Sequence, residues 1–190
     1  MEIIAKKIVN YLDANETIWN EKERMEMMLG LEILVHNIVM IGTILVMAKV
    51  IGIFIEAILL LAAYGTLKMT AGGIHFNKSS SCLLATGAFV MGGAVISHNF
   101  SIDILISVWI YIVCIILLAF IGPKGTPNNP ISREKYKKLK IQAICIILGY
   151  LMITVCIPIK LNYIKNLLLI AVVFETISLF PLGLKSRNKC

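Results

Sequence analysis

One histidine and one cysteine lie in the longest polar interruption between two strongly apolar runs in the first half of the chain. Residues 71–82 read AGGIHFNKSSSC and include His75, one of three histidines, and Cys82. A cysteine is nucleophilic as its thiolate, which a nearby base or a helix N-terminus favours. Serines 79–81 are typical of helix starts, and an apolar run follows them. We therefore predict that Cys82 lies in the first turn of a helix, where the helix dipole favours a negative sulfur.

The spacing of His75 and Cys82 requires a bend in the chain between them. In one continuous helix the two residues would share a face, but their Cα atoms would be about 10.5 Å apart. A nucleophile and its base need about 3 Å between their heavy atoms. The glycine pair 72–73, Asn77 and the serines permit such a bend. We therefore predict that residues 69–81 are irregular backbone that carries His75 back toward the start of the next helix.

This segment resembles the active-site segment of the AgrB (accessory gene regulator B) family. Residues 68–75, KMTAGGIH, together with Cys82 fit the pattern K-x-x-A-G-G-x-H-x(6)-C. The resemblance implies that His75 and Cys82 are the catalytic pair and that Lys68 and Gly73 have supporting roles. Family members often carry arginine where this chain has Lys68, and lysine lacks the two-pronged geometry of a guanidinium. The chain length, the apolar segments and the basic character fit the same family.

The resemblance also implies an activity and a partner. AgrB proteins are membrane-embedded cysteine endopeptidases of Gram-positive quorum sensing. They cut a small propeptide, AgrD, and join its internal cysteine to the new C-terminus as a thiolactone. A protein of this kind needs no cofactor. It would work in the bacterial cell membrane, and its product would be the precursor of an autoinducing peptide of the kind that controls virulence.

The composition indicates an integral membrane protein. Hydrophobic residues make up 58% of the 190 residues and charged residues only 15%, and the mean hydropathy is +0.87. A soluble domain is closer to half apolar and a quarter charged. At this length we expect one domain over residues 1–190, with an all-α, multi-pass helical bundle as its fold.

The apolar segments set the expected architecture. Residues 1–30 read as interfacial amphipathic helices, one at 3–12 and another at 17–30. About six transmembrane segments follow within residues 31–182, and residues 183–190 form a cytoplasmic tail. Each segment is close to the ~20 residues that cross a bilayer. Their approximate spans are 31–48, 50–67, 82–100, 102–121, 141–159 and 164–182.

The distribution of basic residues predicts the orientation. We place the N-terminus in the cytoplasm. Of the 18 Lys and Arg residues, all but Lys49, Lys160 and Lys165 then lie on the cytoplasmic side. This bias is the one that membrane proteins show. Both termini and the loop around His75 are therefore expected in the cytoplasm, where Cys82 stays a reduced thiol.

Two carboxylates at membrane depth and two further histidines have to be weighed within the apolar segments. Ionisable groups at membrane depth usually face a cavity or a partner. Glu56 and Glu175 are such groups, and Glu175 could pair with a basic group in the bundle. We expect His36 to be a packing residue. His98 lies at the outer end of its segment, a membrane thickness from Cys82, and is therefore excluded from the chemistry.

A basic stretch after the fourth apolar segment has two readings. Residues 122–140 begin with proline and glycine and end as the start of a basic helix. The simpler reading is a topology anchor. The functional reading is an electrostatic dock for an acidic peptide tail, through the lysines Lys135, Lys137, Lys138 and Lys140.

Other classes of site have little support in the sequence. Cys114, Cys145 and Cys156 lie in apolar runs and are expected to pack as small hydrophobes. No His or Cys cluster has the spacing of a metal site, so we expect no metal. The net charge is +7, and the basic residues cluster beside apolar segments. Aromatic residues are not interleaved with them as in nucleic-acid-binding proteins, so we expect membrane lipid rather than nucleic acid as a partner. We also expect a homodimer.

Two alternative functions compete with the peptidase. A small transporter or channel would use Glu56 and Glu175 along its pathway, although the segments show no paired broken helices. A membrane acyltransferase would share the Cys82 thioester and differ only in substrate. Asn77 is the weak candidate for a group that orients His75, and no carboxylate in the segment could take that role.

Overall fold

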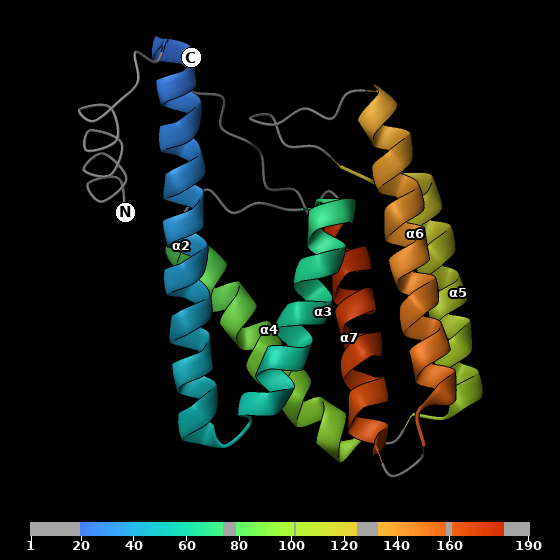
Figure 1. Cartoon of the computed structure of the whole chain (residues 1–190). Coiled ribbons are helices and arrows are strands. Elements are labelled where there is room, and N and C mark those ends of the chain that lie inside the picture. The colour runs from blue at the N-terminus through green and yellow to red at the C-terminus, as the bar shows by residue number, and fades with distance from the viewer. Residues whose placement is uncertain (1–19, 74–78, 101, 125–132, 159–160, 181–190) are drawn as a thin grey trace. The chain divides into compact units, whose positions relative to one another are not determined.

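The computed structural model of the chain describes residues 20–73, 79–100, 102–124, 133–158 and 161–180 (Figure 1). Within these residues the regular structure consists of α-helices, as predicted for an all-α protein. The helices are α2 (Glu21–Ile51), α3 (Phe54–Ala71), α4 (Ser79–Asn99), α5 (Ile104–Ile121), α6 (Arg133–Cys156) and α7 (Asn162–Ser178).

Five of the described helices, α2 to α6, are long and apolar enough to cross a membrane. They carry large, exposed apolar side chains, as helices that face lipid do. Examples, one from each helix, are Val50, Met69, Leu84, Trp109 and Met152. The sixth predicted segment, 164–182, corresponds to α7, which has 17 residues. The fold is therefore an all-α membrane bundle.

The chain divides into two compact units, residues 1–50 and 51–190. In the first unit, α2 is one continuous helix of 31 residues. The sequence placed residues 17–30 and 31–48 in separate segments, whereas from Glu21 onward they form a single element. The predicted amphipathic helix at 3–12 lies outside the described residues, as does the tail at 183–190.

The second unit is organised around α7. This helix contacts α3, α4, α5 and α6, while α3 also contacts α4 and α6, and α5 also contacts α6. In Figure 1, α7 lies between α3 and the α5–α6 pair, and α4 crosses at a slant. Since α7 is the shared neighbour, residues along it can reach functional groups on several helices.

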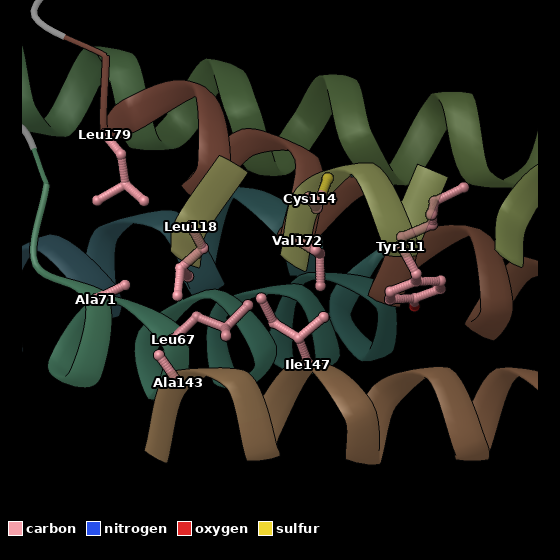
Figure 2. Close-up of a cluster of buried hydrophobic side chains, with 10 residues drawn as sticks. Leu67, Ala71, Tyr111, Cys114, Leu118, Ala143, Ile147, Val172 and Leu179 are labelled. Atoms are coloured by element: carbon pink, nitrogen blue, oxygen red, sulfur yellow. The ribbon is translucent and has the colours of Figure 1, made fainter. Parts of the chain in front are cut away.

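An apolar core joins four of these helices (Figure 2). Leu67 of α3, Leu118 of α5, Ile147 of α6 and Val172 of α7 are buried together. Tyr111 lies in the same cluster and its hydroxyl bonds that of Thr154 at 3.0 Å. Burying this polar group with a partner avoids a desolvation penalty. The core thus packs α3, α5, α6 and α7 against one another.

Candidate functional site

Cys82 lies in the first turn of α4, as the sequence predicts. The helix begins at Ser79, and Cys82, which is not part of a disulfide, is half-buried. The first backbone N–H groups of a helix have no partner within it and present partial positive charge. N–H groups of this kind can stabilise an oxyanion that forms at the start of a helix.

The connection before Cys82 is shorter than predicted. The sequence indicated irregular backbone over residues 69–81, but α3 continues to Ala71 and α4 begins at Ser79. The error has a local cause, because Met69, Thr70 and Ala71 extend an existing helix and the serines enter the next one. The helices α3 and α4 pack against each other, but the bend predicted between His75 and Cys82 involves residues 74–78, which lie outside the described residues, and it stays a prediction.

Two glycines form the start of this bend. Gly72 has φ 79° and Gly73 has φ 102°, which is backbone that favours glycine. The N–H of Gly72 bonds the carbonyl of Lys68 at 3.0 Å and ends α3. A Cβ at Gly72 would overlap the carbonyl oxygen of Lys124, and one at Gly73 would overlap the hydroxyl of Ser178. Both positions therefore need glycine for conformation and for space.

Lys68 points into a polar cluster beside Cys82. Its ammonium donates a 2.7 Å hydrogen bond to the Tyr64 hydroxyl and lies 5.1 Å from the centre of that ring. The Tyr64 hydroxyl is within electrostatic reach of both Cys82 and Glu175. Tyr64 is otherwise packed against Phe89 and Phe174. Lys68, to which the family resemblance gives a supporting role, is thus connected to Cys82 by Tyr64. The sequence did not single out this tyrosine.

Glu175 is the least expected member of this cluster. Its side chain is 1% exposed, and neither carboxylate oxygen has a hydrogen-bond partner among the described residues. The Lys68 ammonium acts on it electrostatically. The sequence flagged Glu175 as a buried acid that could pair with a basic group, but not as part of the cysteine site. Glu175 reaches the cluster around Cys82 only because α7 packs beside α3 and α4.

The other predicted residues of the loop lie outside the described residues. These are His75 and Asn77. The structure therefore places Cys82, Lys68 and Gly73 at one end of the bundle and leaves the pairing of His75 with Cys82 as a prediction.

The basic stretch lies at the same end of the bundle. The N–H of Lys124 donates to the carbonyl of Ala71 at 3.0 Å, and the Tyr136 hydroxyl donates to the carbonyl of Gly122 at 2.8 Å. These bonds tie the ends of α3 and α5 to the start of α6. The predicted docking lysines belong to the first turns of α6, and three of them are exposed: Lys135, Lys137 and Lys138. Lys140 is half-buried.

A separate polar cluster occupies the opposite end. His98 Nε2 lies 2.9 Å from Glu56 Oε1, and the imidazole stacks on Tyr163 with ring centres 5.3 Å apart. Nearby, the Asn166 amide donates to the carbonyls of Ser97 and Phe100. Glu56 thus has a partner, and His98 lies at the other end of α4 from Cys82.

Comparison with known proteins connects this arrangement to a family. A sequence model of accessory gene regulator B matches residues 5–179. A protein of Clostridium acetobutylicum whose name describes it as AgrB-like is 29% identical, over 86% of this chain and 78% of the relative. Similarly named proteins of Clostridium perfringens and Listeria innocua are 26% and 24% identical. They cover 82% and 88% of this chain, and 76% and 82% of the relatives.

No solved structure matches this chain. The family match covers Lys68 in α3, Gly73 after it and Cys82 in α4, and the five apolar helices agree with a membrane location. The chain is therefore a membrane protein of the accessory gene regulator B (AgrB) family, and this membership gives it a role in quorum sensing.

Proposed function

We propose that this protein is a cysteine endopeptidase that processes an AgrD-like propeptide at the cytoplasmic face of the membrane. The observation that carries the proposal is the position of Cys82 in the first turn of α4, beside a bend that begins at two glycines. The sulfur lies at a positive helix end, and the chain that contains His75 joins α3 to α4. Family membership supports a propeptide as the substrate.

The first half of the reaction is an acyl transfer to the cysteine. His75 takes the proton from the Cys82 thiol, and the sulfur attacks the carbonyl carbon of the scissile peptide bond. The N–H groups at the start of α4 stabilise the oxyanion. The carbon–nitrogen bond then breaks, and the histidine gives its proton to the departing amine. The C-terminal tail leaves, and the remaining peptide is held on Cys82 as a thioester.

The second half releases the peptide as a ring. The thiol of the peptide's internal cysteine gives its proton to His75, and its sulfur attacks the thioester carbon. A new carbon–sulfur bond forms as the bond to Cys82 breaks, so the thiolactone leaves and the enzyme thiol is restored. Water would hydrolyse the thioester, so the site needs shelter. The half-buried position of Cys82 between packed helices supports this requirement.

The surroundings of Cys82 suggest how the substrate is held. The exposed lysines of α6 lie at the same end of the bundle and would attract an acidic peptide tail. In this proposal both chain termini lie in the cytoplasm, where the propeptide is made. We further propose a homodimer in contact with membrane lipid, which native mass spectrometry from lipid nanodiscs would test.

A trapping experiment tests the proposed chemistry. The purified protein in liposomes is incubated with a propeptide whose internal cysteine is replaced by alanine, so that the ring cannot close. We expect a covalent adduct on Cys82 that hydroxylamine releases, with the tail as a separate product. Cys82→Ala and His75→Ala should give neither, whereas the matched variant Cys145→Ala, which removes an exposed cysteine of α6, should react normally. Cleavage by Cys82→Ala would overturn the proposal.

A further inference from the structure

The carboxylate of Glu175 is buried without a hydrogen bond near the end of α7. The side chain is 1% exposed, and neither oxygen has a hydrogen-bond donor among the described residues. Removing an ionised carboxylate from water without a compensating partner is strongly unfavourable. Buried polar groups of native proteins are nearly always compensated. The burial of this acid therefore requires an explanation from the groups around it.

The end of α3 lies directly against this acid. The last turn of α3 is closed by the N–H of Gly72, which donates to the Lys68 carbonyl at 3.0 Å. A Cβ on the next residue, Gly73, would lie 3.5 Å from Glu175 Oε1 and would overlap the hydroxyl of Ser178. The last turns of α3 and α7 are therefore in contact. Lys68 belongs to the first of these turns, and Glu175 belongs to the second.

Lys68 brings a positive charge to Glu175. Its ammonium acts electrostatically on the carboxylate across the contact between α3 and α7. The ammonium also donates a 2.7 Å hydrogen bond to the Tyr64 hydroxyl. An ammonium has three N–H groups, so this bond is compatible with a charge pair to the carboxylate. Each charge then offsets the burial of the other, as ionisable groups at membrane depth require.

Aromatic packing fixes the hydroxyl that accepts this hydrogen bond. The Tyr64 ring centre lies 5.3 Å from that of Phe89 in α4 and 5.5 Å from that of Phe174 in α7. The two phenylalanine rings are stacked with their centres 3.8 Å apart. Phe174 directly precedes Glu175, and the Tyr64 hydroxyl is within electrostatic reach of Cys82. The ammonium is therefore bound to a hydroxyl of fixed position and attracted by the carboxylate, at the end of the bundle that carries Cys82.

We propose that Glu175 is a positioning residue that acts through Lys68: its carboxylate holds the ammonium at the Cys82 end of the bundle, where the ammonium stabilises the negative charge of the tetrahedral intermediate. This inference rests on the proposed function, because the intermediate forms only if the Cys82 sulfur attacks a carbonyl. A cation that is in place before the reaction stabilises the developing charge without reorganisation. Misplacement of such a group by about 1 Å can lower a rate about 100-fold.

The test measures kcat and KM for cleavage of an AgrD-like propeptide by the full-length protein in liposomes. We expect Lys68→Met and Glu175→Gln each to lower kcat by about 100-fold, with KM changed less than about threefold, because the charge appears only after substrate binding. Glu175→Asp, which keeps the charge, should recover part of the loss. The matched control is Glu56→Gln. It removes a carboxylate that pairs with His98 at the opposite end of the bundle, and it should leave both values unchanged.

A double variant distinguishes positioning from a general structural role. If Glu175 acts through Lys68, adding Glu175→Gln to Lys68→Met should lower kcat no further, because the group that it positions is already absent. Two independent defects would instead multiply to a loss of about 10,000-fold. Each kcat is corrected for the folded fraction of the variant, measured by circular dichroism.

The outcomes separate this inference from the proposed function. Cleavage by Cys82→Ala would reject the peptidase and, with it, the intermediate. If Cys82→Ala is inactive while Glu175→Gln or Lys68→Met keeps the parental kcat, only the role of Glu175 is rejected. A multiplicative loss in the double variant would also reject that role. If Glu175→Gln fails to fold, Glu175→Asp takes its place in the comparison, and its loss of kcat should vanish in the Lys68→Met background.

Discussion

The backbone N–H of Lys124 donates to the carbonyl of Ala71 over 3.0 Å and joins the end of α5 to the end of α3. The adjacent Gly72 pairs with Lys124 in a short parallel bridge. The segment that leads toward the basic stretch is therefore attached to the connection that leads toward Cys82. Substrate docking and bond cleavage, if both occur as proposed, share one backbone junction.

Gly72→Ala should damage this junction. The residue has φ 79°, and a Cβ there would overlap the carbonyl oxygen of Lys124. A non-glycine residue in such backbone is strained by about 1–3 kcal/mol, and the overlap adds to that strain. We expect a lower unfolding temperature in detergent together with slower propeptide cleavage. Gly65→Ala is the matched control, because Gly65 is helical with open space around it, and it should be neutral or stabilising.

His98→Ala should affect stability but not activity. The change leaves Glu56, whose side chain is 15% exposed, without its 2.9 Å partner at the end of the bundle opposite Cys82. Loss of such a partner costs about 1–3 kcal/mol of unfolding free energy. Denaturant titration in detergent measures this loss, and cleavage of a propeptide by the folded fraction should match the parent. A large fall in specific activity would contradict the exclusion of His98 from the chemistry.

Neutralising the basic start of α6 should weaken substrate binding. In a variant with glutamine at Lys135, Lys137, Lys138 and Lys140, we expect KM for an acidic-tailed propeptide to rise about tenfold at low salt. The difference should shrink at high salt, because exposed charges are screened. Membrane insertion should be retained. The control is Lys165→Gln, at the opposite end. If the variant and the parent protein have equal KM values at low salt, the docking hypothesis is rejected, and the basic stretch is interpreted as a topology anchor.

The predicted orientation can be tested by thiol labelling of intact cells. A variant that keeps Cys82 and replaces the other cysteines with alanine should react with a membrane-impermeant maleimide only after permeabilisation. The same background with Cys82→Ala and Asp103→Cys should react without it, because Asp103 is exposed at the start of α5, at the other end of the bundle. Labelling of Cys82 in intact cells would show that the predicted orientation is wrong and that the opposite topology holds.

Local sequence signals predicted part of the site well. Three serines before an apolar run indicated the helix start that contains Cys82, and two glycines indicated the bend before it. Both signals act within a few residues of chain, so no tertiary information is needed. The limits of the irregular stretch were too wide at both ends. Helices extend until a residue stops them, and Gly72 rather than Met69 is that residue here.

The tertiary part of the site could not be read from the sequence. Glu175 was recognisable as an acid at membrane depth, and Lys68 as a basic residue near the motif. Glu175 and Lys68 come close only because α7 packs against α3, and these two segments are far apart in the chain. The same holds for His98 and Glu56, which were considered separately. Helix order in a bundle is set by side-chain packing, for which hydropathy carries no signal.

The central position of α7 has a consequence for how the protein is made. This helix is the last one described in the chain, yet the other four of its unit all contact it. Until α7 has been synthesised, none of its contacts with α3, α4, α5 and α6 can form, and Glu175 is absent. A nascent chain therefore holds Cys82 in an unfinished bundle, and the proposed peptidase activity would begin only after α7 has been made and inserted.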